Sequence, residues 1–271
     1  MECFGFKNRR TDAEKRRGTF AEQKMKVNNY LKLISLNIEL NRHYDVIFPF
    51  LKKERPDVVC LQEVVGRDMP LFIEALGMSE RFEPMVRAAN NSSIRTGLDN
   101  LPVGLALFSR FPSEFRADYY AGQAGIIPEE REDNQSTNLI LLRATLSASD
   151  RVFTVGTTHF TWTPDGEAND IQRSDLQGLF SVLARIPELV FCGDFNAPRG
   201  REIWTEIAKK YKDNIPLEYK SSLDPALHRA PNLQYVVDGL WSTPKYRCTE
   251  TKLVDGVSDH RAIVSIIELS G

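Results

Sequence analysis

The sequence predicts an α/β fold in which two mostly antiparallel sheets pack face to face and carry helices on their outer sides. Helical patterns separate some of the apolar, strand-like runs, whereas short polar turns join others, and this mixture suits a layered arrangement. Hydrophobic residues make up 42% of the 271 residues, which is enough for a sizeable core. Candidate functional residues are spread from Asn37 to His260, so we expect one domain over residues 28–271.

The first half of the chain alternates strand-like runs with helical patterns. Val46, Ile47 and Phe50 fall on one side of a helix, and Pro56 ends this pattern before the next apolar run. The elements expected here are strands over 30–38, 57–61 and 103–109 and helices over 44–53 and 69–76. These helices are the ones that should cover the outside of a sheet.

The second half is richer in strands. The polar run over 147–150 separates two apolar runs and is typical of a hairpin turn. The expected elements are strands over 138–146, 151–158, 189–192, 235–241, 247–252 and 262–269, and helices over 171–184 and 202–211. Turn-rich stretches lie at 88–102, 122–136, 163–170 and 213–231. Because loops carry much of the variable polar character, we expect substrate choice to reside in these stretches.

Charge is distributed unevenly along the chain. Residues 1–27 hold eight basic and four acidic side chains, a net charge of +4, which leaves −6 for residues 28–271. This polar, basic N-terminal extension is either a solvated segment, the simpler interpretation, or an arm that contacts nucleic acid or another anionic partner. The total net charge of −2 provides no overall field that would attract nucleic acid.

The composition indicates a soluble, cytoplasmic protein that has no membrane segment. No apolar run approaches the roughly 18 to 20 residues of a membrane helix, and the first residues lack the apolar stretch of a signal peptide. The four cysteines show neither zinc-ligand spacing nor a C-x-x-C pair, so we expect free thiols. Nothing in the sequence indicates an obligate protein partner.

Five short segments each join an apolar run to residues suited to phosphate or metal chemistry. These residues are Asn37, Glu63, His159, Asp194, Asn196, Asp259 and His260. Carboxylate and amide oxygens are ligands that Mg²⁺ prefers, and an imidazole can donate a hydrogen bond to a phosphoryl oxygen. Together the segments predict a site that binds a divalent metal ion and hydrolyses a phosphate ester.

The segment over 193–196 is the most specific of the five. Asp194 and Asn196 alternate around Phe195, so both side chains can face one side of an extended chain. A carboxylate and an amide at this spacing can polarise and orient a water molecule. A plain turn after a strand explains the same residues, but it does not explain why so apolar a strand leads directly into them.

Taken singly, the other candidates have simpler explanations. Glu63 could be a strand-end glutamate in solvent, and Asn37 could simply end a strand. His159 could be a structural histidine. We interpret His43 and His228 as structural, because they fall at an expected helix start and in an expected loop.

Taken in order, these residues resemble the endonuclease/exonuclease/phosphatase superfamily. The matching motifs are Asn37, the Leu-Gln-Glu of 61–63, the Gly-Asp-Phe-Asn of 193–196 and the Ser-Asp-His of 258–260. The runs over 104–110 and 235–240 resemble its central strand and its late, aspartate-bearing strand. The resemblance extends over residues 30–269 in the order of the family, so the motifs are specific jointly although each is weak alone.

The resemblance implies a four-layer α/β sandwich with the site at one end. It also implies Mg²⁺ or Mn²⁺ as the cofactor. In such a site the metal ion would be held chiefly by Glu63, with Asn37 and Asp259 nearby.

The same resemblance implies roles for the remaining site residues. Asp194 would orient or activate the attacking water, and Asn196 would steady that water or the phosphate. His260 would contact the phosphate and would itself be held by Asp238. His159 would contact the phosphate from the other side.

The expected activity is that of a divalent-metal-dependent phosphodiesterase, a nuclease or DNA-end phosphodiesterase acting on a phosphodiester substrate such as DNA or RNA. The run over 157–159 resembles the histidine-bearing branch, shared by deoxyribonuclease I, sphingomyelinases and tyrosyl-DNA phosphodiesterases. The acidic body favours an alternative, a phosphatase or phosphodiesterase of small phosphorylated metabolites or lipids. A catalytically inactive binding protein on the same fold is a further alternative, which the intact acidic and histidine set disfavours.

Overall fold

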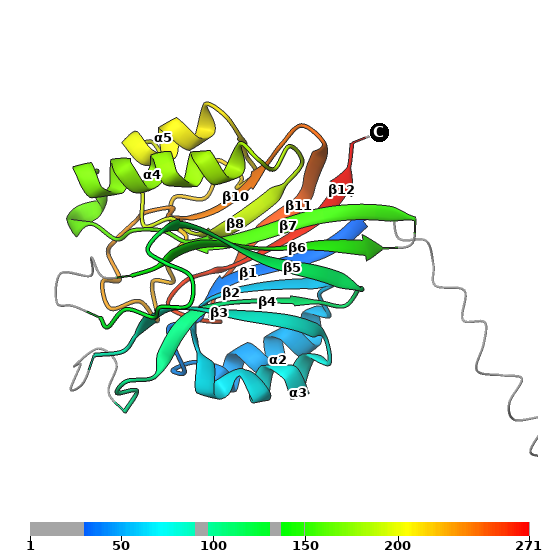
Figure 1. Ribbon diagram of the computed structural model, residues 1–271, viewed down its shortest axis with the longest axis horizontal. Helices are drawn as coiled ribbons and strands as arrows, with labels where there is room; N and C mark the ends of the chain where they lie inside the picture. Colours follow the sequence, from blue (N-terminus) through cyan, green and yellow to red (C-terminus); the bar gives the residue numbers. More distant parts are fainter. Residues whose placement is uncertain (1–29, 90–96, 131–136, 149, 271) are drawn as a thin grey trace, which may run out of the picture.

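Two six-stranded sheets form the centre of the structure, a computed structural model that describes residues 30–89, 97–130, 137–148 and 150–270. Helices α2 (Tyr44–Glu54) and α3 (Met69–Leu76) cover the outer face of one sheet, and α4 (Asp170–Leu183) and α5 (Glu202–Ala208) cover that of the other (Figure 1). The layers follow the order helix, sheet, sheet, helix, which confirms the predicted α/β sandwich. The basic extension over residues 1–27 lies outside the described residues.

The two sheets have the same pattern of strand directions, with one parallel pair at the centre of each sheet. The first sheet has the order β11 (Tyr246–Val254), β12 (Ala262–Leu269), β1 (Tyr30–Asn37), β2 (Val58–Val65), β4 (Pro102–Ser109), β3 (Ser79–Arg87). The second has the order β5 (Ser113–Ala121), β6 (Leu139–Ala148), β7 (Arg151–His159), β8 (Val190–Asp194), β10 (Asp238–Ser242), β9 (Lys212–Asp213). Only β1–β2 and β7–β8 are parallel among the described strands, and helices α2 and α4 make the crossovers that parallel neighbours need.

Alternation along the strands separates two apolar layers. In β1, Leu31 and Leu33 belong to the cluster between the sheets, whereas Ile34 and Leu36 pack with the residues of α2 and α3. All four side chains are at most 1% exposed. Full burial of one such side chain stabilises the fold by about 1.5–3 kcal/mol. The same alternation turns the side chain of Asn37, at the end of β1, towards the second sheet.

Three strands were not expected from the sequence, namely β3, β5 and β9. β3 and β5 are edge strands, and both carry charged side chains and stay largely half-buried or exposed. Charged residues on a sheet edge discourage pairing with other chains, and they also weaken the hydrophobic signal by which a strand is predicted. β9, with two residues, is too short to give a pattern.

Three element boundaries differ from the prediction by three residues or more. The strand expected over 57–61 continues to Val65 and so contains Glu63. The helix expected over 202–211 ends at Ala208, and the strand expected over 235–241 begins only at Asp238. The residues before Asp238 instead bond to loops, because Val236 and Val237 accept the N–H groups of Arg199 and Phe195. Short 3₁₀ helices cover Gly66–Asp68 and Pro164–Gly166.

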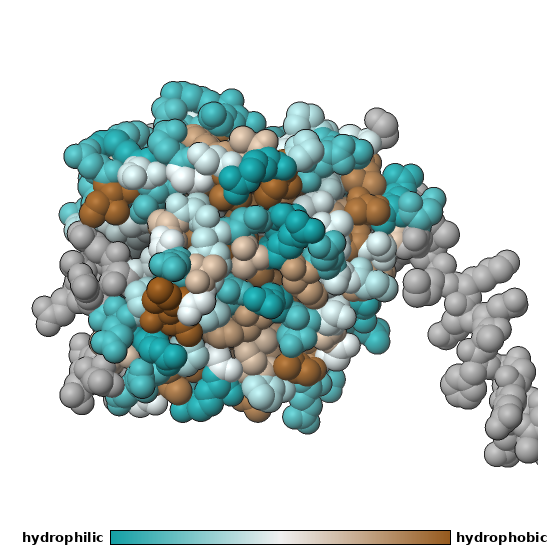
Figure 2. All heavy atoms as spheres, in the orientation of Figure 1, coloured by the Kyte–Doolittle hydropathy of each residue, from teal (hydrophilic) through white to brown (hydrophobic). Residues whose placement is uncertain are grey.

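The surface view places the most hydrophobic residues in separate patches among hydrophilic ones on the face drawn (Figure 2). Single exposed apolar residues are normal on protein surfaces. Within the described part of the chain, no helix is long and apolar enough to cross a membrane.

Candidate active site

The candidate residues converge where strands of both sheets end at the same edge. Parallel pairing places Asn37 beside Gln62 and His159 beside Asp194. Antiparallel pairing of β10 with β8 then sets Asp238 opposite Asp194. Two sheets that face each other therefore bring polar residues from distant parts of the sequence into one cluster.

Asn37 connects the two sheets. Its amide nitrogen donates to Glu63 Oε1 at 3.2 Å and to Asp194 Oδ2 at 3.1 Å. Its oxygen accepts the N–H of Glu39 at 3.1 Å, which fixes the orientation of the amide. Asn37 thus turns its nitrogen, not its oxygen, towards the two carboxylates, and its oxygen keeps one lone pair for a further contact.

The backbone is strained at two of the motifs. Glu63 has φ 59° and lies at an irregularity in the pairing of β2 with β4, between Leu61 and Val64. Asn196 has φ 49°. Left-handed backbone at a residue other than glycine costs roughly 1–3 kcal/mol and is found preferentially at functional sites. The irregularity re-aims the Glu63 side chain at the point where the strand passes the site.

Gly193 is required by close contact. A Cβ at this position would lie 1.9 Å from the carbonyl oxygen of Thr158, and its φ is 139°. Only glycine allows the chain of β8 to approach β7 this closely. This approach sets His159 and Asp194 side by side.

Asp194 is surrounded by hydrogen-bond donors. Besides Asn37, the N–H of Asn196 donates to its Oδ1 at 2.8 Å, and the Nε2 atoms of His159 and His260 lie 3.5 and 3.8 Å from its Oδ2. Burial opposes its charged form, but the charge of His260 and the hydrogen bond of His159 outweigh burial and lower the pKa of Asp194. Asp194 is therefore a carboxylate at neutral pH.

The two imidazoles beside Asp194 have raised pKa values, which favour their protonated forms. Burial opposes the charged form of His260, but the charges of Asp238 and Asp194 raise its pKa well above the usual range. Burial likewise opposes the charged form of His159, and the hydrogen bond and charge of Asp194 raise the pKa of His159 overall. Both rings can therefore donate to an anion.

A chain of contacts holds the His260 ring in place. His260 Nδ1 lies 2.8 Å from Asp238 Oδ2. The hydroxyl of Ser222 accepts the N–H of Val237 at 2.9 Å and of Asp238 at 3.0 Å. With Nδ1 bonded to Asp238, the Nε2 of His260 faces the centre of the site, where Asp194 lies.

Asn196 is held through its side chain as well as its backbone. Its amide nitrogen donates to the carbonyl oxygen of Phe160 at 2.9 Å. The amide oxygen of Asn196 is therefore left to accept a hydrogen bond from another donor.

The opposite side of the site is acidic. Burial, followed by the charges of Glu39 and Glu63, raises the pKa of Asp259 to about 6, although His260 partly offsets this. Glu39, His43 and Asp259 offer ligand atoms that lie within 4.8 Å of one another. The carboxylates of Glu39 and Asp259 are hard oxygen donors, which suit a cation such as Mg²⁺ or Mn²⁺. The residues present therefore fit a divalent metal ion.

Sequence reasoning missed Glu39 and His43 at this site. Glu39 lies two residues after Asn37, with φ 47°, and its carboxylate pairs with His43 Nε2 at 2.8 Å. The i, i+4 spacing of Glu39 and His43 was the available signal. Because the pair lies on a turn and not on a strand, the pattern of apolar runs did not point to it.

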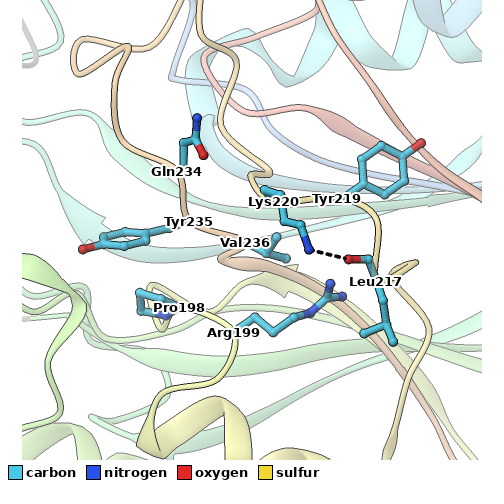
Figure 3. A pocket seen from close by; sticks show the side chains of 8 residues that line it. All are labelled: Pro198, Arg199, Leu217, Tyr219, Lys220, Gln234, Tyr235 and Val236. Carbon is cyan, nitrogen blue, oxygen red and sulfur yellow. Dashed lines mark hydrogen bonds between the residues drawn. The ribbon is translucent and has the colours of Figure 1, made fainter.

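A pocket of about 410 Å³ lies on segments that lead into the site (Figure 3). Pro198 and Arg199 follow Asn196, and Tyr235 and Val236 precede Asp238. Arg199 is neutralised, because its Nε lies 3.0 Å from an oxygen of Asp213. The ammonium of Lys220 contacts only the carbonyl oxygen of Leu217 among the described residues, at 3.3 Å, and so keeps donors for an anion.

Comparison with known proteins identifies a family and a fold. Residues 34–260 match the model of the Endonuclease/Exonuclease/phosphatase family, whereas no curated protein matches the sequence. The fold resembles that of an endonuclease/exonuclease/phosphatase from Beutenbergia cavernae DSM 12333, with 17% identity, a TM-score of 0.67, and coverage of 89% of this chain and 72% of that one.

Two further solved structures share the fold. One is the human Nocturnin catalytic domain with bound sulfate anion, with 19% identity and a TM-score of 0.63, covering 89% of this chain and 95% of that one. The other is a mannosyl-6-phosphatase from Bacteroides thetaiotaomicron VPI-5482, with 13% identity and a TM-score of 0.60, covering 89% of this chain and 100% of that one. At these identities the likeness concerns the fold alone.

Proposed function

This chain belongs to the endonuclease/exonuclease/phosphatase family, and we propose that it is a divalent-metal-dependent phosphodiesterase. The observation that carries the proposal is the position of Asp194. It is a buried carboxylate with a lowered pKa, bonded through Asn37 to Glu63 on one side and flanked by His159 and His260 on the other. A cation site, a water-orienting carboxylate and two phosphate donors would thus adjoin one another.

Glu63 and Asp259 are the residues that would hold the metal ion, with the free lone pair of the Asn37 oxygen as a third donor. The high pKa of Asp259 supports this assignment, because a cation would stabilise the charged form that burial and Glu39 destabilise. When bound, Mg²⁺ or Mn²⁺ polarises a phosphoryl oxygen and offsets the charge that develops on it.

Asp194 would orient the attacking water. The water oxygen forms a bond to phosphorus while its proton passes to Asp194, and the ester oxygen leaves with the bonding electron pair. Asn37 and the N–H of Asn196 fix the carboxylate in place. The free oxygen of Asn196 would accept the second hydrogen of the water.

The two imidazoles would bind the phosphate. Because the pKa of His260 is raised, its Nε2–H is a charged donor, and Asp238 keeps the ring aligned. His159 would donate from the neighbouring strand. Each such donor stabilises the charge of the transition state more than that of the ground state.

Metal dependence tests the proposal directly. Turnover of a small chromogenic phosphodiester should vanish in excess chelator and return with Mg²⁺ or Mn²⁺. Glu63→Gln should raise the metal concentration needed for half-maximal rate, while circular dichroism shows an unchanged fold. Full turnover in excess chelator would overturn the metal proposal.

The substrate class divides the proposal into two candidates. A nuclease or DNA-end phosphodiesterase is the first, because the run over 157–159 resembles the histidine-bearing branch that includes deoxyribonuclease I and tyrosyl-DNA phosphodiesterases. A phosphatase of small metabolites is the second, favoured by the net charge of −6 over residues 28–271 and by the sugar phosphatase among the proteins of this fold. Parallel assays with oligonucleotides, a dinucleotide and sugar phosphates under Mg²⁺ would separate them.

A further inference from the structure

His228 lies on a turn that is built onto the active site. The carboxylate of Asp224, 1% exposed, accepts the N–H groups of Ala226 at 2.8 Å and Leu227 at 3.1 Å. Its other oxygen accepts the N–H of Gly256 at 2.6 Å. The backbone N–H of Asp224 donates to the carbonyl oxygen of Asp259 at 2.8 Å. The turn is therefore fixed to the same segment that carries Asp259 and His260.

The His228 ring meets the His260 ring nearly at a right angle. The two centroids are 6.3 Å apart, with an interplanar angle of 80°. His228 is half-buried, so part of its ring stays exposed beside the ring of His260. Two hydrogen bonds of about 2.8 Å to one anion can span two rings at this separation.

The contacts of Nδ1 determine which nitrogen of His228 carries the hydrogen. The backbone N–H of Ala230 donates to His228 Nδ1 at 3.1 Å, and the carbonyl oxygen of Ala230 lies farther away, at 3.3 Å. A hydrogen on Nδ1 would face the hydrogen of that N–H, so Nδ1 is the acceptor and Nε2 carries the hydrogen. Among the described residues, no acceptor bonds to Nε2.

The ring is neutral at pH 7, which suits it to a site that already contains charged imidazoles. Burial lowers the pKa of His228 and the charge of His260 lowers it further, whereas the nearby carbonyl oxygen of Ala230 acts in the opposite direction. A neutral N–H donor adds a hydrogen bond to an anion without repelling a protonated neighbour.

We propose that His228 is a third imidazole of this site and donates its Nε2–H to a phosphoryl oxygen of the bound substrate, beside His260. The inference rests on the proposed function, because it assumes that the phosphate binds at His260. It assigns a substrate contact to a residue that the sequence pattern indicated to be structural. It also gives the turn at 224–228 a reason to be tied to the segment that carries His260.

Two substitutions distinguish loss of the Nε2–H donor from loss of the Nδ1 contact that stabilises the turn. His228→Asn keeps an acceptor near Nδ1 for the N–H of Ala230 but lacks a donor at the position of Nε2. His228→Gln loses that acceptor and keeps an amide N–H at about the reach of Nε2. We expect kcat/KM for a small phosphodiester to fall at least tenfold in His228→Asn and less in His228→Gln, as loss of one donor to a charged group predicts. The reverse order would overturn the proposal, because His228 would then act only through the turn.

Binding without turnover provides the second test. Inorganic phosphate is titrated into the full-length chain with Mg²⁺, and the imidazole ¹⁵N resonances are followed, with His228→Asn used for assignment. The expected result is that the Nε2 resonances of His228 and His260 shift with the same dissociation constant. A shift of His260 without His228 overturns the inference and leaves the proposed function standing. If neither resonance shifts, the proposed phosphate site fails and the inference fails with it.

Discussion

The two parallel strand pairs, β1–β2 and β7–β8, occupy corresponding places in their sheets and yet end in different chemistry. Each pair is joined by a helix that lies on the outer face of its sheet (Figure 1). The first pair delivers Asn37 and Glu63, and the second delivers His159 and Asp194. The comparison teaches that the fold supplies the positions, whereas the side chains at the strand ends decide the chemistry.

The two sides of the site also shift the pKa of their buried carboxylates in opposite directions. Asp194 is surrounded by donors of the protein, and its pKa is lowered. Burial, together with the charges of Glu39 and Glu63, raises the pKa of Asp259 to about 6 against the opposing charge of His260. A carboxylate with a lowered pKa keeps its charge at neutral pH and can accept a hydrogen bond from water, whereas one with a raised pKa gains more from a nearby cation. We therefore assign the side of β1–β2 to the metal ion and the side of β7–β8 to water and phosphate.

Asp194→Asn should have the largest effect on this division. It removes the group that takes the proton of the water, so hydrolysis should fall by about 10²–10⁴-fold. Metal binding should persist, and phosphate should bind equally well or more tightly because a negative charge is removed. Single-turnover rates and isothermal titration with Mg²⁺ and phosphate measure both quantities. Loss of metal binding in Asp194→Asn, with Glu63→Gln still binding metal, would show that the two sides have been exchanged.

The imidazoles test the phosphate side of the comparison. His159→Ala or His260→Ala should each lower kcat by about 10²-fold, the scale of losing one transition-state donor. The melting temperature should fall less in His159→Ala than in His260→Ala, because Asp194 keeps Asn37 and the N–H of Asn196 as donors. It should fall in His260→Ala, which leaves Asp238 buried without its partner. A normal rate with a reduced melting temperature in His159→Ala would make this residue structural.

Asn37 donates to a carboxylate on the metal side, Glu63, and to one on the water side, Asp194, so its substitution tests both sides at once. Asn37→Ala removes the donor shared by Glu63 and Asp194, so both metal affinity and rate should fall, each by about tenfold on the scale of one hydrogen bond to a charged group. Glu63→Gln and Asp194→Asn should each change mainly one of these quantities. Equilibrium dialysis with Mn²⁺ and steady-state kinetics make the test. An Asn37→Ala variant that loses rate but binds metal normally would place Asn37 on the water side alone.

Strand ends were the predictable part of this molecule. The buried runs before Asn37, Asp194 and Glu63 are apolar on both faces, so the polar residue that ends or interrupts each run stands out in the sequence. Parallel pairing then brings these ends together. What the sequence did not reveal lies outside such runs, namely the edge strands with mixed charge, the Glu39–His43 turn and the turn that carries His228. Their positions depend on contacts between loops, and such contacts leave no periodic pattern of apolar residues in the sequence.

The smallest effect is expected from removing the basic N-terminal extension, because its charge lies outside both sides of the site. Residues 1–27 carry +4 against −6 for the remainder, so they are the obvious means of attracting a nucleic acid. We expect that deletion of residues 1–24 leaves turnover of a small chromogenic phosphodiester unchanged, because no group assigned to the site lies in that segment. Binding to an oligonucleotide, measured by fluorescence anisotropy over a range of salt concentrations, tests the remaining possibility.

The salt dependence distinguishes the two interpretations of this extension. An arm that neutralises phosphates makes log K fall with log salt, and each lost contact reduces the slope by about 0.7 for a single strand. A flatter slope after deletion would show that the extension binds nucleic acid. It would also favour the nuclease over the metabolite phosphatase, because the acidic body would then have a basic segment that brings the polymer to the histidine side. An unchanged slope leaves recognition to the site itself, where His159, His260 and His228 would have to bind the phosphate without long-range attraction.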